Sequence, residues 1–228
     1  MGNTAADTIP PTAVIITTAA CAGLSPSVAE LEKIQSISSL HRRGRPTDCR
    51  VMLSESLDQL RAAIRDVPDF PQPGILFKDI TPVLADARLI NLAIDGMIEN
   101  FIDQKVDKVV GIDARGFIFG AMMAQRLGAG FVPVRKKGKL PWKTRGVDYS
   151  LEYGTNSVEM HLDALASGER VILADDLLAT GGTAGAAVKL IEETGATLLG
   201  SVFFIELAFL DGRQKLSRSG PIHSLLTF

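Results

Sequence analysis

The stretch that decides the fold of this chain is residues 171–187, VILADDLLATGGTAGAA. An apolar run, 171–174, leads into two adjacent carboxylates, Asp175 and Asp176, and a turn rich in Thr and Gly follows. From Gly182 to Glu193 the small and apolar residues recur with a helical period. The pattern predicts a buried strand with an acidic end, a turn, and the N-terminus of a helix.

This turn has the chemistry of a phosphate site. Glycine lets the backbone approach a ligand closely, and the free N–H groups and dipole of a helix N-terminus favour an anion. The neighbouring carboxylates can accept hydrogen bonds from sugar hydroxyls or hold a divalent metal. Together these features indicate a phosphorylated sugar. The turn lacks the Gly-Lys-Ser/Thr of a P-loop NTPase and the Gly-x-Gly-x-x-Gly of a dinucleotide fold, which excludes both.

Residues 171–183 resemble the diphosphate-binding signature of the phosphoribosyltransferases: an apolar run, two acids, two apolar residues, Ala or Asp, and Thr-Gly-Gly-Thr. The resemblance implies that Asp175 and Asp176 bind the ribose hydroxyls of phosphoribosyl pyrophosphate. It implies a 5′-phosphate site at Ala179, Thr180, Gly181, Gly182 and Thr183. It also implies Mg²⁺ as cofactor, carried by the substrate and held near the two carboxylates.

A second strand-to-helix turn lies in residues 111–120, GIDARGFIFG. An Arg at a helix start opposes the helix dipole unless an anion neutralises it. The resemblance places pyrophosphate at this turn and implies a cis peptide bond between Asp113 and Ala114. The residues implied to hold pyrophosphate are Asp113, Ala114, Arg115, Gly116, Lys136 and Lys139.

The basic segment 135–141, RKKGKLP, resembles the one that opens the family's mobile catalytic loop. Its cations suit a polyphosphate leaving group, whose charge grows as the bond breaks. In dimeric relatives a basic residue of this segment enters the neighbouring subunit's site. Arg135 is the candidate for that role, and a homodimer is therefore expected.

Three further segments resemble the adenine branch of the family. Residues 69–80, DFPQPGILFKDI, look like the hood that holds the base, with Lys78 near a phosphate, and residues 204–207 look like the late strand bordering the pocket. Residues 149–154, YSLEYG, look like the catalytic-loop segment. The implied adenine pocket consists of Leu76, Phe77, Lys78 and Leu207.

The acid–base group is implied by what the turn lacks. Many 6-oxopurine enzymes of the family have Asp where this chain has Ala179, and Ala cannot move a proton. The resemblance assigns that work to Glu152 beside purine N7, with Tyr153 next to it. The pKa of Glu152 would have to rise in a closed, water-poor site.

The implied reaction is transfer of a phosphoribosyl group to adenine, giving AMP and pyrophosphate. Two alternatives stay open: a 6-oxopurine enzyme of the same fold, and a regulator that senses phosphoribosyl pyrophosphate without turnover. Such regulators usually carry a DNA-binding domain, and residues 1–50 show no helix-turn-helix pattern.

Along the chain, strands and helices alternate. We expect a helix capped by Ser54 or Ser56, a hood strand at 158–162 containing His161, and a final strand at 198–207. Further helices are expected at 87–101, 115–127 and 182–193, and further strands at 106–112, 130–134 and 171–174. Alternation implies right-handed crossovers and an α/β, doubly wound, mainly parallel sheet, with ligands beyond the strand C-terminal ends. The resemblance adds a small hood and a mobile catalytic loop.

Composition limits the alternatives. A formal charge of −2 gives no reason to expect nucleic-acid or membrane binding, and 6% aromatic residues argue against a base-stacking protein. Cys21 and Cys49 have no metal-site spacing and favour a reducing compartment, so a cytoplasmic protein is expected.

Residues 1–50 differ from the phosphoribosyltransferase domain expected at 51–228, because they are rich in Thr, Ala, Ser and Pro. Their apolar stretch at 13–23 is too short for a membrane span, and no basic region precedes it as in a signal peptide. We expect a disordered extension; a transit peptide and a true start at Met52 are the alternatives.

Overall fold

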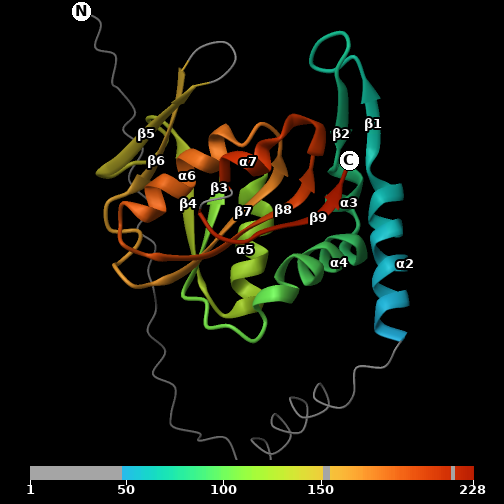
Figure 1. Cartoon of the computed structure of the whole chain (residues 1–228), viewed down its shortest axis with the longest axis horizontal. Coiled ribbons are helices and arrows are strands. Elements are labelled where there is room, and N and C mark those ends of the chain that lie inside the picture. The colour runs from blue at the N-terminus through green and yellow to red at the C-terminus, as the bar shows by residue number, and fades with distance from the viewer. Residues whose placement is uncertain (1–47, 151–154, 217–218) are drawn as a thin grey trace, which may run out of the picture. The chain divides into compact units, whose positions relative to one another are not determined.

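The computed structural model describes residues 48–150, 155–216 and 219–228. Thr47–Phe228 is one compact unit, built on a seven-stranded sheet in the order β5-β6-β4-β3-β7-β8-β9 (Figure 1). Five neighbouring strands, β4 through β9 in that order, are parallel, and β5 and β6 are antiparallel at one edge. The strands are β3 (Lys108–Ile112), β4 (Gly130–Lys136), β5 (Thr144–Ser150), β6 (Thr155–His161), β7 (Arg170–Leu178), β8 (Thr197–Glu206) and β9 (Ile222–Thr227).

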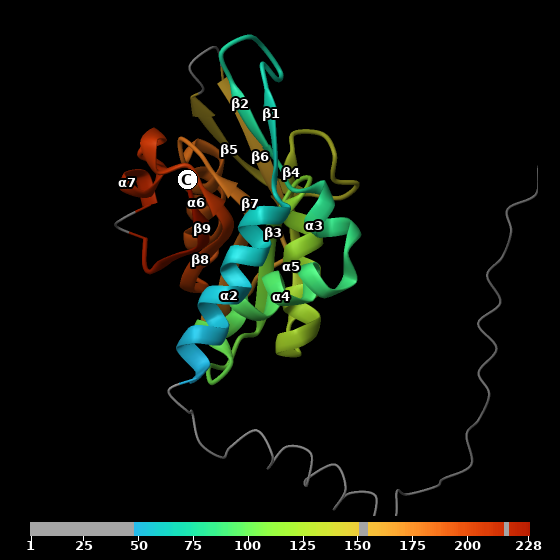
Figure 2. The same cartoon turned by 90° about the vertical axis from the view of Figure 1, so that its right-hand side faces the viewer.

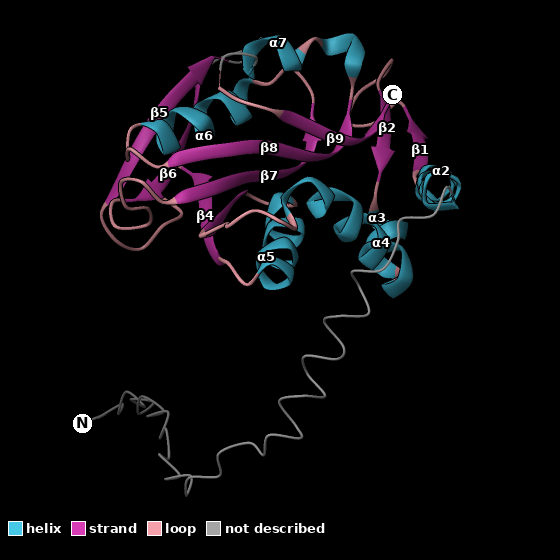
Figure 3. Cartoon of the chain, turned by 60° about the horizontal axis from the view of Figure 1, so that its bottom comes forward, coloured by secondary structure: helices cyan, strands magenta, loops and turns pink. Residues whose placement is uncertain are grey.

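Helices cover both faces of the sheet, which confirms the doubly wound α/β fold (Figure 3). The α4 and α5 helices pack on one face and α6 and α7 on the other. Neighbouring side chains of one strand point to opposite faces, so Ile172 belongs to the core cluster under α5, and Leu173 to the cluster under α6. The helices are α2 (Asp48–Ala63), α3 (Thr81–Ala85), α4 (Ala87–Ile98), α5 (Gly116–Leu127), α6 (Gly182–Glu192) and α7 (Gly212–Leu216), with 3₁₀ turns η1 (Glu99–Phe101) and η2 (Ala208–Leu210).

The strand order reverses between β3 and β7. From β3 the chain crosses through α5 to β4 on one side, whereas β7 lies on the other side of β3 and leads through α6 to β8. Open α/β sheets bind ligands at such a reversal, beyond the C-terminal ends of the strands. The loops after β3 and β7 are therefore placed together by topology.

The two carboxylates of the opening stretch lie inside β7, because that strand continues to Leu178 and not only to Ala174 as expected. Pairing with β3 stops at Ala174, but pairing with β8 continues to Leu178. On the β3 side, Asp175 and Asp176 thus border the loop that follows β3.

A separate antiparallel hairpin forms the hood: β1 (Arg65–Pro68) and β2 (Leu76–Asp79). It rises from the same end of the compact unit as the β5–β6 hairpin (Figure 2). The strand expected at 158–162 is present as the end of β6, but its assignment to the hood is wrong, because β6 pairs with β4 and β5 in the main sheet.

Helix boundaries also differ from expectation. The α2 helix begins at Asp48, so neither Ser54 nor Ser56 caps it, and the predicted end of α4 is the 3₁₀ turn η1. The strand β9 and the helix α7 were not predicted. Within the described residues, no helix is both long enough and apolar enough to cross a membrane.

Candidate functional site

A cavity of about 290 Å³ lies at the reversal point between β3 and β7. Its lining is Ile112 to Arg115, from the end of β3 and its loop, and Asp175 to Ala184, from the end of β7 through the start of α6. The topology therefore brings together two turns that the sequence analysis selected independently. A second cavity of about 220 Å³ shares Ile112, Asp113 and Thr183 with the first and adds, among others, Lys136, Tyr149 and Asn156.

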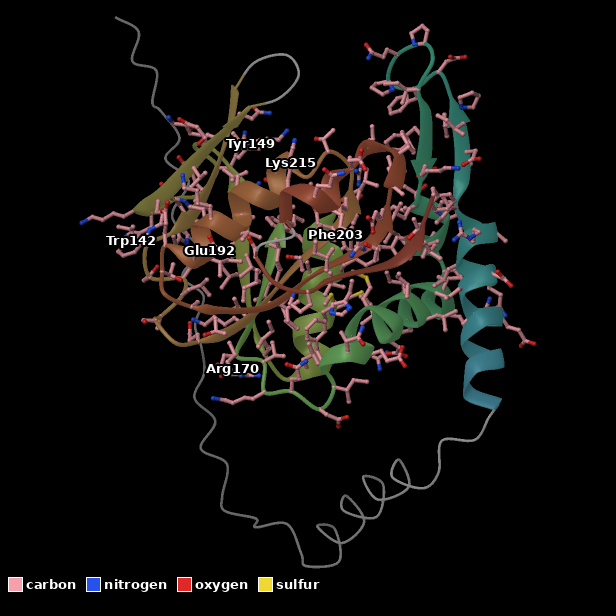
Figure 4. The ribbon with its side chains drawn as sticks, in the orientation of Figure 1. Trp142, Tyr149, Arg170, Glu192, Phe203 and Lys215 are labelled. Carbon is pink, nitrogen blue, oxygen red and sulfur yellow. The ribbon has the colours of Figure 1, made fainter. Side chains whose placement is uncertain are left out.

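The glycine-rich turn presents an open helix N-terminus to the first cavity. Gly181 is the N-cap of α6 in the left-handed conformation, with φ of 75°, and no side chain caps the helix. The first N–H groups of α6 are thus available to a ligand. Thr183 also donates a hydrogen bond of 3.2 Å from Oγ1 to the hydroxyl of Tyr149 on β5, a residue labelled in Figure 4.

The two adjacent carboxylates have different surroundings. Asp176 is 8% exposed and accepts a hydrogen bond from Arg115 Nε at 2.5 Å. Asp175 accepts one from the backbone N–H of Asp176 at 2.9 Å, and its Oδ1 faces Gly116. Burial, and then the neighbouring carboxylate, raise the pKa of Asp175 well above its usual value of 3.8. Of the two carboxylates, Asp176 is the one paired with a cation, Arg115.

Gly116 lets α5 begin against β7. A Cβ at this position would lie 2.6 Å from Asp175 Oδ1 and 3.0 Å from the carbonyl oxygen of Ala174. Any larger residue would push the start of α5, and Arg115 with it, away from the carboxylates. The requirement for glycine here is thus steric and comes from β7.

Arg115 of the predicted pyrophosphate turn and Arg135 of the basic segment are both paired with carboxylates. Arg115 is the N-cap of α5, where its positive charge opposes the helix dipole. Asp176 supplies the anion that neutralises this charge. Arg135 Nε donates to Asp113 Oδ2 at 2.9 Å, and its Nη1 donates to the carbonyl of Lys139 at 3.1 Å. The peptide bond between Asp113 and Ala114 is cis, which confirms what the resemblance implied.

The hood approaches the cavity through Phe77. The centroid of the Phe77 ring lies 5.8 Å from the guanidinium carbon of Arg115. The ring of Phe70 packs edge-on against the Phe77 ring, with 5.2 Å between the two centroids. Leu76, the preceding residue on β2, is 52% exposed. One arginine thus connects the hood to the carboxylates of β7.

None of the four residues of the predicted base pocket lines either cavity. The ammonium of Lys78 pairs with Asp66 at 2.6 Å and lies 4.5 Å from the centroid of the Phe228 ring. Leu207 follows β8, and its N–H donates to the carbonyl of Leu178 at 2.9 Å. Glu152 and Tyr153 lie outside the described residues, between β5 and β6.

Gly212 and Arg213, next to the turn that follows β7, were not predicted from the sequence. Gly212 lies against the turn at Ala179, and Arg213 pairs with Glu206. One signal was available: Glu206 ends an otherwise apolar strand, and a carboxylate in such a strand needs a charged partner. The described residues contain no group of three or more His, Cys, Asp or Glu side chains arranged to hold a metal.

Comparison with known proteins matches residues 80–220 to the phosphoribosyl transferase domain. The adenine phosphoribosyltransferase of Anaeromyxobacter dehalogenans is 55% identical over 172 residues, which cover 75% of this chain and 99% of that protein. The crystal structure of the Rhodothermus marinus adenine phosphoribosyltransferase is 53% identical with a TM-score of 0.74, covering 77% of this chain and 99% of that chain. The Saccharomyces cerevisiae enzyme, crystallised with adenine and an iminoaltritol bisphosphate, is 41% identical with a TM-score of 0.72. The match covers 75% of this chain and 99% of the yeast chain.

The matched domain contains both turns that line the main cavity, including the two carboxylates of β7 and the open start of α6. Sequence identity above 50% extends over nearly the whole length of the bacterial relatives. The chain therefore belongs to the phosphoribosyltransferase family, in its adenine phosphoribosyltransferase branch.

Proposed function

We propose that this chain transfers the 5-phosphoribosyl group of phosphoribosyl pyrophosphate to adenine, giving AMP and pyrophosphate, as a step of purine salvage. One observation carries the proposal: a single cavity joins two carboxylates, an open helix N-terminus and the arginine of the neighbouring turn. The names of the relatives support adenine as the base.

In this proposal the sugar phosphate lies along the end of β7. The N–H groups from Thr180 to Thr183 and the dipole of α6 bind the 5′-phosphate. Asp176, which is paired with Arg115, accepts hydrogen bonds from the ribose hydroxyls, and Asp175 supports the backbone beside it. A sugar held at both ends stays in place while positive charge develops at C1′.

The leaving pyrophosphate is assigned to the turn after β3 and to the basic segment. Arg115 lines the first cavity and Lys136, at the end of β4, lines the second. Arg135 lines neither, but it bonds Asp113, which lines both, and Lys139 follows on the same segment. Both arginines are held by carboxylates through Nε, so other N–H groups of each remain for an anion. These pairs keep each guanidinium oriented before the substrate arrives, which lowers the entropy cost of binding.

Proton transfer at the purine is assigned to Glu152, with Tyr153 beside it and the backbone of Leu76 and Phe77 against the base. A protonated Glu152 beside N7 polarises the purine and stabilises the leaving base in the reverse direction. This role requires a site closed to water, which would raise the pKa of the carboxyl and would limit hydrolysis of the sugar donor.

Mg²⁺ fits this site as a substrate-borne ion. The described residues form no metal-binding cluster of their own, but Asp175 and Asp176 supply oxygen ligands beside the expected diphosphate. Mg²⁺ is typically bound by one or two carboxylates together with substrate phosphates. When bound, it would neutralise charge on the leaving pyrophosphate.

A panel of nucleobases tests the function. The protein is incubated with phosphoribosyl pyrophosphate, Mg²⁺ and adenine, hypoxanthine, guanine or xanthine, and nucleotide formation is followed. AMP formation with adenine alone is expected. A preference for 6-oxopurines would favour the related oxopurine enzymes, and binding of phosphoribosyl pyrophosphate without turnover would favour a regulator.

We also propose that the catalytic domain spans residues 51–228 and acts in the cytoplasm as a homodimer, with a cation of the segment 135–139 entering the partner's site. Arg135 already pairs with Asp113 of its own chain. In a dimer, the N–H groups of Arg135 that do not bind Asp113 would therefore be the ones available to the partner's site. Light scattering after gel filtration measures the mass of the assembly, and a monomer would contradict the shared site.

A further inference from the structure

The phosphate-binding turn is backed by a segment some thirty residues further along the chain. A Cβ added at Gly212 would lie 2.0 Å from the carbonyl oxygen of Ala179 and 2.9 Å from the nitrogen of Gly181. A Cβ at Gly181 would lie 2.5 Å from the carbonyl oxygen of Gly212. The two backbones are thus in direct contact, and neither glycine has room for a side chain.

An ion pair with two hydrogen bonds holds Gly212 in this position. Arg213 donates from Nε to Glu206 Oε1 at 2.9 Å and from Nη2 to Oε2 at 2.6 Å. Its Nη1 also donates to the carbonyl of Ile222 on β9 at 3.0 Å. Glu206 is 6% exposed, and its hydrogen bonds with Arg213 lower its pKa, so the pair is formed throughout the neutral range. The start of α7 is therefore fixed to both β8 and β9.

Contacts from the end of β8 and from α7 also hold Leu178, the residue that leads into the turn. Leu178 pairs with Glu206 in the β7–β8 ladder, and its carbonyl accepts a hydrogen bond from the N–H of Leu207. At the other end of α7, Leu216 is buried in the core cluster that contains Leu178 and residues of α6. Figure 3 shows α7 beside α6 on the same face of the sheet, and Lys215 marks α7 in Figure 4.

We propose that Gly212 and Arg213 are positioning residues for the 5′-phosphate site, acting as a brace behind the turn. They hold the backbone of residues 179–181 so that the N–H groups at the start of α6 converge on one point, and they do not touch the ligand. Two consecutive glycines, Gly181 and Gly182, have large conformational freedom, and a turn fixed in advance loses less entropy when it binds. This inference rests on the proposed assignment of the turn to the 5′-phosphate.

Direct binding of two separate probes tests the brace. Ribose 5-phosphate uses the 5′-phosphate turn, whereas inorganic pyrophosphate uses the turn after β3, and each is titrated calorimetrically into the full chain. Gly212→Ala should weaken ribose 5-phosphate at least tenfold and change pyrophosphate less than twofold. Gly185→Ala is the matched control, because its Cβ would make an ordinary contact of 3.9 Å with Leu216 and should change neither affinity.

A milder variant keeps the test decisive if Gly212→Ala does not fold. Arg213→Lys keeps the charge but loses the two-pronged geometry, and we expect ribose 5-phosphate to weaken about threefold or more with pyrophosphate unchanged. Glu206→Gln should have the same selective effect, and the double variant should be no worse than the more impaired single one. Unchanged ribose 5-phosphate affinity, or equal loss for both probes, would overturn the brace.

These measurements also separate the brace from the proposed reaction. If the unmodified protein binds ribose 5-phosphate but makes no AMP, the proposed function fails while the binding comparison still decides the brace. If AMP is made, Gly212→Ala should raise KM for phosphoribosyl pyrophosphate with KM for adenine unchanged. A merely structural role for Gly212 would alter both constants or neither.

Discussion

Replacing Arg115 with Gln removes the cation that joins the turn after β3 to β7. Its partner, Asp176, is 8% exposed, and a hydrogen bond to a charged group contributes ~1.5–3 kcal/mol to stability. The Arg115 side chain is 45% exposed, so solvent screens part of the interaction and the lower end, about 1.5 kcal/mol, applies. For a domain of this size we expect the melting temperature to fall by roughly 3–6 °C, measured by calorimetry.

The same substitution acts on the reaction, because the proposed site places Arg115 at the pyrophosphate. Loss of one charge-assisted hydrogen bond of ~1.5–3 kcal/mol corresponds to a rise of about 10- to 150-fold in KM for phosphoribosyl pyrophosphate. KM for adenine should stay within about twofold. Initial rates measured against each substrate in turn give both constants.

Arg126→Gln is the matched control, because Arg126 lies at the other end of α5 and pairs with the exposed Asp95. We expect it to change stability by less than ~1 kcal/mol and neither KM by more than about twofold. If Arg115→Gln melted like the parent and kept its KM for phosphoribosyl pyrophosphate, the role of the Arg115–Asp176 pair would be refuted.

Three further substitutions test individual side chains. Glu152→Gln should lower kcat by about 10²- to 10⁴-fold while ribose 5-phosphate still binds in calorimetry, and full turnover would contradict its acid–base role. Folding raises the pKa of Asp175, so the stability that its protonation contributes is present below pH 3.8 and lost as pH rises through the folded-state pKa. Asp175→Asn should therefore need more urea to unfold at pH 7, with the gain shrinking toward pH 4; a loss at pH 7 would contradict this. Gly116→Ala should cost ~1–3 kcal/mol by overpacking against Asp175, and an unchanged urea midpoint would exclude that contact.

The parts of the fold that follow from local patterns were predicted well. The strands β3, β4, β7 and β8 and the helices α5 and α6 lie within a few residues of their expected positions. Each has an apolar run or a helical period that the sequence shows directly. The edge strands β5 and β9 were missed because their residues are partly exposed and their identity as strands depends on pairing with distant segments.

The candidate site was predicted as a set of residues but not as an arrangement. Two turns, 113–116 and 179–183, were selected separately, and the cavity that contains both exists because β3 and β7 are neighbours. The pairing of Arg115 with Asp176 joins residues 61 positions apart. Lys78, expected near a phosphate, is held by Asp66 and the ring of Phe228, and residue spacing gives no information on that competition.

By itself, the sequence determined that residues 171–187 form a strand, a turn and a helix with a glycine-rich start, because apolar periodicity and glycine act within a few residues. Only the tertiary structure decided which carboxylate Arg115 holds, why Gly116 must be glycine, and that Gly212 lies against the turn at 179–181. These are contacts between segments brought together by the order of strands in the sheet. Distances of that kind depend on the packing of the whole domain, which no local pattern encodes.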